Sequence, residues 1–218
     1  MKIAIYGAGA IGLWLGAHLA RAGAQVSAVA RGATLAALQR DGMVLHSAGS
    51  VLHNLVTAVP DPQALGVQDL VIVSVKSPAL REVAQHIAPL LGPQTIVLPA
   101  INGVPWWFLQ GFGGAYAGAA LQSVDAWGAI AQRIPTQHIV GCVVHASCST
   151  SAPGVCQHHF GNGLIIGEPS GEKTPRVLAL QALLVKAGMD AKVSDQIQKD
   201  IWYKLWGNMT MNPISAIT

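Results

Sequence analysis

Short, almost wholly apolar runs alternate with segments of helical periodicity in the first half of the chain. The run Leu70–Val75 is rich in β-branched residues and has no polar alternation, which is typical of a strand buried on both faces of a parallel sheet. Glycines close the first two units, Gly7 after a strand pattern and Gly23 after a helical one. Strands that alternate with helices predict right-handed β–α–β units and an open α/β sheet.

We expect strands at Lys2–Tyr6, Gln25–Ala30, Leu70–Val75 and Thr95–Leu98, helices at Ala10–Ala22, Ala33–Arg40 and Pro78–Leu91, and a small hairpin at Met43–Leu45 and Val51–Thr57. The second half is expected to add strands at His138–His145, Val155–Phe160, Leu164–Gly167 and Ala191–Val193, and a helix that Thr174-Pro175 begins and Gly188 ends.

A long helical pattern closes the sequence. Ser194 is its predicted N-cap, and Asp195 is expected in its first turn, where an acidic residue is favourable. The apolar positions of this helix need a packing partner, and they include Ile197, Ile201, Leu205 and Trp206. We therefore expect a Rossmann-type dinucleotide-binding α/β domain at residues 1–193, and at 194–218 the first long helix of an all-helical domain that is incomplete here.

Composition and charge exclude several classes of protein. A net charge of +3, scattered along the chain, does not indicate nucleic-acid binding, although it suits an anionic cofactor and substrate. The uncharged stretch 83–124 is not expected to cross a membrane, because it is interrupted by Pro89, Gly92, Pro93, Pro99, Asn102 and Pro105. The N-terminus lacks the pattern of a secretory signal, and the 3 cysteines are an odd number. We expect a cytoplasmic protein with reduced thiols.

The segment Gly7-Ala8-Gly9-Ala10-Ile11-Gly12 fits the G-x-G-x-x-G pattern of dinucleotide-binding folds. It follows a predicted strand and opens a predicted helix, which is the context that the pattern requires. Gly7 permits the tight turn, Gly9 lets the backbone approach a pyrophosphate, and Gly12 allows close packing of helix on strand. The amino end of the helix then offers free N–H groups and partial positive charge to the phosphates.

The end of the second strand indicates which cofactor binds. NAD-specific folds usually place an acidic residue about 20 residues past the glycine motif, but Arg31 stands in this region and no carboxylate does. A guanidinium there can bind a ribose 2′-phosphate, so we expect NADP(H). Lys76 follows the third strand, where ligands of open α/β sheets bind, and is expected to contact cofactor or substrate charge.

Two later motifs resemble the ketopantoate reductase (2-dehydropantoate 2-reductase) family. They are Asn102-Gly103 after a strand and the run Lys204-x3-Asn208-x3-Asn212-Pro213, whose polar residues share one helix face. The resemblance implies NADPH-dependent reduction of 2-dehydropantoate to pantoate, a step of pantothenate and coenzyme A synthesis. It also implies that a homodimer could form through the helical domain.

The resemblance also implies roles for individual residues. Lys204 would donate the proton, since negative charge develops on the keto oxygen as hydride adds to the carbon. Asn102, Asn208 and Asn212 would hold substrate oxygens, and Asn102 would also orient the nicotinamide. The backbone near Ser147 would lie against the cofactor.

Some alternatives stay open at this stage. The protein could reduce another branched 2-keto acid, or it could be a non-catalytic NADP-binding regulatory module. The aromatic segment 104–108 could reshape the substrate entrance, or it could be a hydrophobic loop packed on the helical domain. No metal site is expected, because the Cys and His spacings between residues 142 and 159 do not match those of zinc ligands. A thiol nucleophile at Cys148 is not favoured, because no base-orienting group accompanies it.

Overall fold

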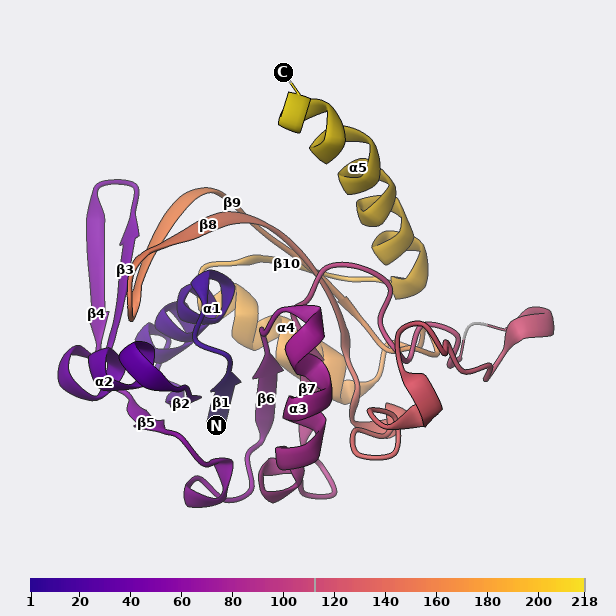
Figure 1. Cartoon of the computed structure of the whole chain (residues 1–218), viewed down its shortest axis with the longest axis horizontal. Coiled ribbons are helices and arrows are strands. Elements are labelled where there is room, and N and C mark those ends of the chain that lie inside the picture. The colour runs from indigo at the N-terminus through magenta and orange to yellow at the C-terminus, as the bar shows by residue number, and fades with distance from the viewer. Residues whose placement is uncertain (112, 218) are drawn as a thin grey trace.

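A five-stranded parallel sheet forms the centre of the molecule (Figure 1). The computed structural model describes residues 1–111 and 113–217. The strands lie in the order β5-β2-β1-β6-β7, and their bounds are Thr57–Val59, Gln25–Val29, Lys2–Tyr6, Leu70–Val73 and Ile96–Pro99. All neighbours are parallel, as the continuous apolar runs predict. The α/β fold class is confirmed.

A second five-stranded sheet lies across helix α1 (Ala10–Arg21), which contacts strands of both sheets (Figure 1). Strand β9 is its centre and pairs with β8, β3 and β10, while β3 also pairs with β4. The bounds are Met43–Ser47 for β3, Ser50–Asn54 for β4, Gly141–Ala152 for β8, Val155–Gly167 for β9 and Asp190–Val193 for β10. The remaining helices are α2 (Gly32–Asp41), α3 (Leu80–His86), α4 (Pro175–Lys186) and α5 (Ile197–Ile217).

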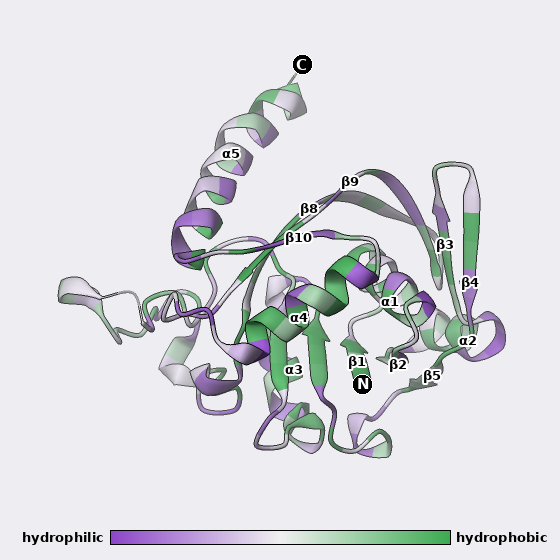
Figure 2. Cartoon of the chain, turned by 180° about the vertical axis from the view of Figure 1, so that it is seen from behind, coloured by the Kyte–Doolittle hydropathy of each residue, from purple (hydrophilic) through white to green (hydrophobic). Residues whose placement is uncertain are grey.

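The parallel sheet separates two hydrophobic clusters. Successive side chains of β1 alternate between them, with Ile3 and Ile5 in one cluster and Ala4 and Tyr6 in the other. The first cluster fills the space around α1 and α4, and the second lies under α3 and the base of α5. Strand β1 is coloured mostly hydrophobic in Figure 2, as expected for a strand whose residues 3–6 are buried.

The aromatic segment 104–108 belongs to the second cluster rather than to an exposed loop. Trp106 and Trp107 are 3% and 1% exposed, and Trp106 Nε1 donates to the Ile134 carbonyl oxygen at 3.4 Å. A Cβ on Gly141 would lie 2.5 Å from Trp107 Cη2, so this glycine makes room for the indole. Phe108 packs toward α5, with ring centroids 6.4 Å from Trp202. The segment therefore supports the base of α5.

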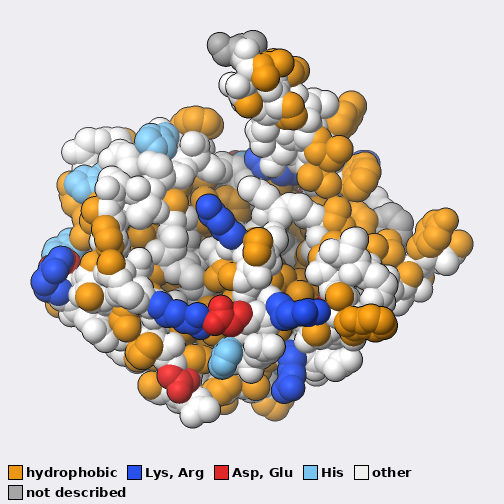
Figure 3. All heavy atoms as spheres, in the orientation of Figure 1, with side chains coloured by type: hydrophobic (Ala, Val, Ile, Leu, Met, Phe, Trp, Pro, Cys, Tyr) orange, Lys and Arg blue, Asp and Glu red, His pale blue; other side chains and the backbone are white. Residues whose placement is uncertain are grey.

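Helix α5 projects from the body and carries hydrophobic side chains on its surface (Figure 3). Its first turns are anchored, because Ile197 and Ile201 are buried in the second cluster. Trp206 is 63% exposed, and Leu205 is half-buried. The division of the chain at residue 193/194 stays a prediction.

Several predicted boundaries are wrong for physical reasons. The Val51–Thr57 strand is two strands, because β5 leaves the hairpin and joins the parallel sheet. The Pro78–Leu91 helix is α3 flanked by two 3₁₀ turns, each containing a proline that interrupts helical hydrogen bonding. The strand predicted at His138–His145 begins only at Gly141, and His138 lies in a 3₁₀ turn. The strands predicted at Val155–Phe160 and Leu164–Gly167 are one strand, β9, which continues through residues 161–163.

The start of α5 also differs from its prediction. The helix begins at Ile197, and Asp200 rather than Asp195 lies in its first turn. The Ser194 hydroxyl nevertheless accepts a hydrogen bond from the Gln196 N–H at 3.0 Å and donates to Asp200 Oδ2. In the described part of the chain, no helix combines the length and apolar character needed to cross a membrane.

Candidate active site

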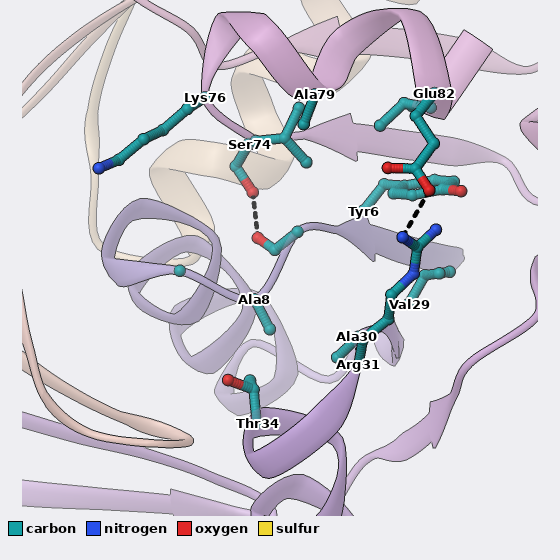
Figure 4. A pocket seen from close by; sticks show the side chains of 14 residues that line it. Tyr6, Ala8, Val29, Ala30, Arg31, Thr34, Ser74, Lys76, Ala79 and Glu82 are labelled. Carbon is teal, nitrogen blue, oxygen red and sulfur yellow. Dashed lines mark hydrogen bonds and ion pairs between the residues drawn. The ribbon is translucent and has the colours of Figure 1, made fainter. Parts of the chain in front are cut away.

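A cavity of ≈ 360 Å³ opens where β1, β2 and β6 end (Figure 4). In an open α/β sheet, this edge is the usual place for a ligand. The predicted Gly7, Ala8, Gly9, Arg31 and Lys76 all line it, whereas Ala10, Ile11 and Gly12 are not among its lining residues. The other lining residues are Tyr6, Val29, Ala30, Thr34, Ser74, Val75, Ala79, Glu82 and Val83.

The glycine loop has the geometry that its sequence predicts. Gly7 has φ +100°, a backbone conformation that side chains disfavour, and a Cβ there would lie 2.6 Å from Val75 Cγ1. A Cβ on Gly12 would lie 2.3 Å from the Gly7 carbonyl oxygen. That oxygen also accepts a hydrogen bond from Ser74 Oγ at 2.7 Å, which ties the loop to the end of β6.

Gly9 and the start of α1 leave room for an anion. A Cβ on Gly9 would meet no atom within 4 Å, so the backbone here faces open space. Gly9 is the N-cap of α1, and no side chain caps the helix. The first N–H groups of α1 are therefore available to phosphate oxygens, and the loop fits a dinucleotide pyrophosphate.

The two glycines can be separated experimentally. We expect Gly12→Ala to lower the free energy of unfolding by about 1–3 kcal/mol, because its methyl group would collide with backbone. Gly9→Ala should change that free energy by less than about 1 kcal/mol yet weaken NADPH binding about tenfold or more. Urea unfolding and fluorescence titration with NADPH measure the two effects. Equal behaviour of the two variants in both assays would contradict the assignment of this loop.

Arg31 lies at the carboxyl end of β2 and faces the cavity (Figure 4). Its Nη1 donates to Glu82 Oε1 on α3 at 2.5 Å, and this bond raises the pKa of Arg31. Tyr6 lies nearby with its pKa raised, mainly by burial and against the lowering effect of Arg31. Lys76 is exposed and lies on the other side of the pocket from Arg31 in Figure 4. The cavity thus offers cationic groups at two separated points.

A second, smaller cavity lies beyond the end of β7, the next strand of the sheet. Asn102, Lys204 and Asn208 line it together, along with Ile101, Gly103, Cys142, Val143, Ile201 and Leu205. Lys204 and Asn208 are half-buried on the inner face of α5, four residues apart, as the helical spacing predicts. At ≈ 10 Å³ the cavity is far smaller than a keto acid, so it could not enclose one in this structure.

The electrostatic surroundings of Lys204 include a histidine. Burial lowers the pKa of His145, the Lys204 ammonium lowers it further, and Asp200 partly opposes both. His145 therefore favours its neutral form beside this lysine. Burial also raises the pKa of Cys142 to about 12, so the thiol in the cavity wall stays protonated and is a poor nucleophile.

Besides Ala10, Ile11 and Gly12, two further predicted residues line neither cavity. Asn212 is exposed further along α5, and Ser147 lies on β8, opposite Phe160. Sequence reasoning did not single out Glu82, which lines the first cavity, or His145, which lies within electrostatic reach of Lys204, because tertiary packing brings each of them there and no local motif marks them. Among the described residues, no group of three or more His, Cys, Asp or Glu side chains could hold a metal ion.

Comparisons with known proteins place this arrangement in a family. Residues 3–106 match the family described as Ketopantoate reductase PanE/ApbA. A 2-dehydropantoate 2-reductase of Mesorhizobium japonicum is 47% identical over 100% of this chain and 67% of its own length. The chain belongs to the ketopantoate reductase family.

Solved structures agree with this family. A Ralstonia solanacearum MolK2 protein assigned to the ketopantoate reductases is 53% identical, with a TM-score of 0.95 over 99% of this chain and 67% of that one. A D-mandelate dehydrogenase, solved with NADH and anilino(oxo)acetate, is 23% identical with a TM-score of 0.79 over 98% of this chain and 63% of that one, which shows the shared fold alone. The chain spans about two thirds of the length of these ketopantoate reductase relatives.

Proposed function

We propose that the whole protein catalyses the NADPH-dependent reduction of 2-dehydropantoate to pantoate. One observation carries the proposal: Asn102, Lys204 and Asn208 line a single cavity at the same sheet edge as the glycine-loop cavity. Along the strand order β2-β1-β6-β7, the glycine-loop cavity occupies the first three strand ends, and the lysine lies beyond the fourth. A dinucleotide bound along this edge would bring its nicotinamide toward Asn102.

The chemistry follows from these positions. NADPH supplies a hydride to the keto carbon when it is bound. The carbonyl π electrons move to oxygen, and the Lys204 ammonium donates a proton to that oxygen, which yields the 2-hydroxy acid and a neutral lysine. The amides of Asn102 and Asn208 would orient the substrate oxygens, and Asn212 is proposed to join them from the next turn of α5. The backbone near Ser147 is proposed as a further cofactor contact.

The proposal is tested by turnover of the full-length protein. Absorbance at the NADPH band should fall only when 2-dehydropantoate is added, and other branched 2-keto acids should react more slowly. Faster reduction of another 2-keto acid would move the assignment to that substrate. Binding of NADPH without turnover of any keto acid would favour a non-catalytic NADP-binding module.

NADP(H) rather than NAD(H) is proposed because Arg31 stands where a 2′-phosphate would lie and no acidic residue occupies the end of β2. Arg31→Ala should weaken NADPH binding by about 10- to 100-fold, because a charge-assisted hydrogen bond to phosphate is lost. NADH binding should change less than about threefold, since NADH lacks that phosphate. Calorimetric titration with both cofactors measures the two constants. An equal loss for both would contradict the NADP assignment.

A further inference from the structure

Glu82 occupies the part of the nucleotide cavity where Arg31 ends. It reaches from α3 across the pocket, and Figure 4 shows its carboxylate meeting the Arg31 guanidinium. The Arg31 Nη1 to Glu82 Oε1 distance is 2.5 Å, and the two side chains are 60% and 51% exposed. The pair therefore stands at the open surface of the cavity, within reach of a ligand.

The Arg31–Glu82 pair brings a negative charge into a cavity whose other charged lining residues are positive. In the described part of the chain, Glu82 is the only acidic residue that lines the cavity, whereas Arg31 and Lys76 are its cationic residues. The Glu82 carboxylate accepts a hydrogen bond from the Arg31 guanidinium, and a 2′-phosphate would otherwise accept that bond. It also repels a dianionic phosphate at short range. A cofactor without the 2′-phosphate, such as NADH, is affected neither by the competition for Arg31 nor by the charge repulsion.

We propose that Glu82 is a cofactor-specificity residue that competes with the 2′-phosphate of NADP(H) for Arg31. The inference rests on the proposed function, in which Arg31 binds that phosphate. Glu82 thereby reduces the preference of the protein for NADPH over NADH. Binding of the phosphate releases the carboxylate to solvent, and binding of NADH leaves the Arg31–Glu82 pair in place.

Glu82→Gln in the full-length protein tests this competition with nucleotide probes, independently of turnover. The probes are 2′,5′-ADP, which carries the 2′-phosphate, and 5′-AMP, which does not. We expect the variant to bind 2′,5′-ADP about three- to fivefold more tightly, because exposed ion pairs are weak, while 5′-AMP binding changes less than about twofold. Asp41→Asn is the matched control, since the Arg40–Asp41 pair is also exposed, at 2.6 Å, but lies outside the cavity.

A double-variant cycle completes the test. In an Arg31→Ala background, Glu82→Gln should tighten 2′,5′-ADP binding relative to 5′-AMP by a smaller factor than in the wild-type background, because the competition for Arg31 is gone and only the solvent-screened repulsion remains. Unchanged 2′,5′-ADP affinity in Glu82→Gln, or an equal change for both probes, would overturn the role of Glu82 while leaving the reductase proposal intact. If wild-type protein does not prefer 2′,5′-ADP to 5′-AMP, the NADP assignment itself fails, and the competition fails with it.

Discussion

Lys204→Ala is expected to lower kcat for 2-dehydropantoate reduction by about 10²- to 10⁴-fold, the usual contribution of a positioned proton donor. The half-buried Lys204 side chain lines the cavity with Asn102 and Asn208. Among the described residues it is the only lysine that lines this cavity, so its removal leaves the cavity without an ammonium group. Helical structure should persist, because alanine is the best helix former. The dissociation constant for NADPH should stay within about twofold, since Lys204 does not line the glycine-loop cavity.

Steady-state kinetics and NADPH titration of the same preparations check that kcat falls while the affinity for NADPH is retained. Lys199→Ala is the matched control, because Lys199 lies on the same helix but is exposed and outside the cavity of Lys204. It should retain wild-type kcat within about twofold. If Lys204→Ala keeps more than about a third of wild-type kcat, Lys204 is not the proton donor.

Glu168→Ala is expected to lower the free energy of unfolding by about 2 kcal/mol, because it removes a buried carboxylate that accepts several charge-assisted hydrogen bonds, although Arg176 itself is 34% exposed. The side chain of Glu168 is 4% exposed, and it accepts bonds from Arg176 Nε at 2.7 Å and from Arg176 Nη2 and Thr174 Oγ1 at 2.5 Å each. Thr174 is the N-cap of α4, and Arg176 also donates to the Gln137 and Ile139 carbonyl oxygens. This carboxylate thus joins the end of β9 to α4 and to the segment before β8.

Urea unfolding measures the loss, with Glu172→Ala as the control. Glu172 is exposed, and its carboxylate contacts the Ser170 hydroxyl at 3.2 Å, so its removal should cost less than about 0.5 kcal/mol. A loss below about 1 kcal/mol for Glu168→Ala would mean that the three-element junction does not depend on this ion pair.

Local patterns were sufficient to predict the parallel sheet and the glycine loop. The run Leu70–Val75 predicts a strand buried on both faces, and the spacing of Gly7, Gly9 and Gly12 requires a tight turn and close packing. Each inference needs only neighbouring residues. The i, i+4 spacing of Lys204 and Asn208 likewise predicts that they share a helix face, and the structure places both on one cavity wall.

Features that depend on long-range packing could not be predicted in the same way. Glu82 meets Arg31 across 51 residues, and nothing near either residue marks the pairing. Trp107 is buried because Gly141, on β8, leaves space for its ring. Strand β9 runs through Gly161 and Gly163 because it pairs with three other strands, and this pairing outweighs the poor strand propensity of glycine.

Isotope transfer distinguishes direct hydride transfer from NADPH to the keto carbon from any route in which that carbon takes its hydrogen from solvent. Full-length protein would be incubated with 2-dehydropantoate and NADPH deuterated at both C4 positions, and the product examined by mass spectrometry. We expect pantoate with one deuterium on C2, formed at least about 10²-fold more slowly by Lys204→Ala. Pantoate without deuterium, or no pantoate from protein that binds NADPH, would contradict direct hydride transfer.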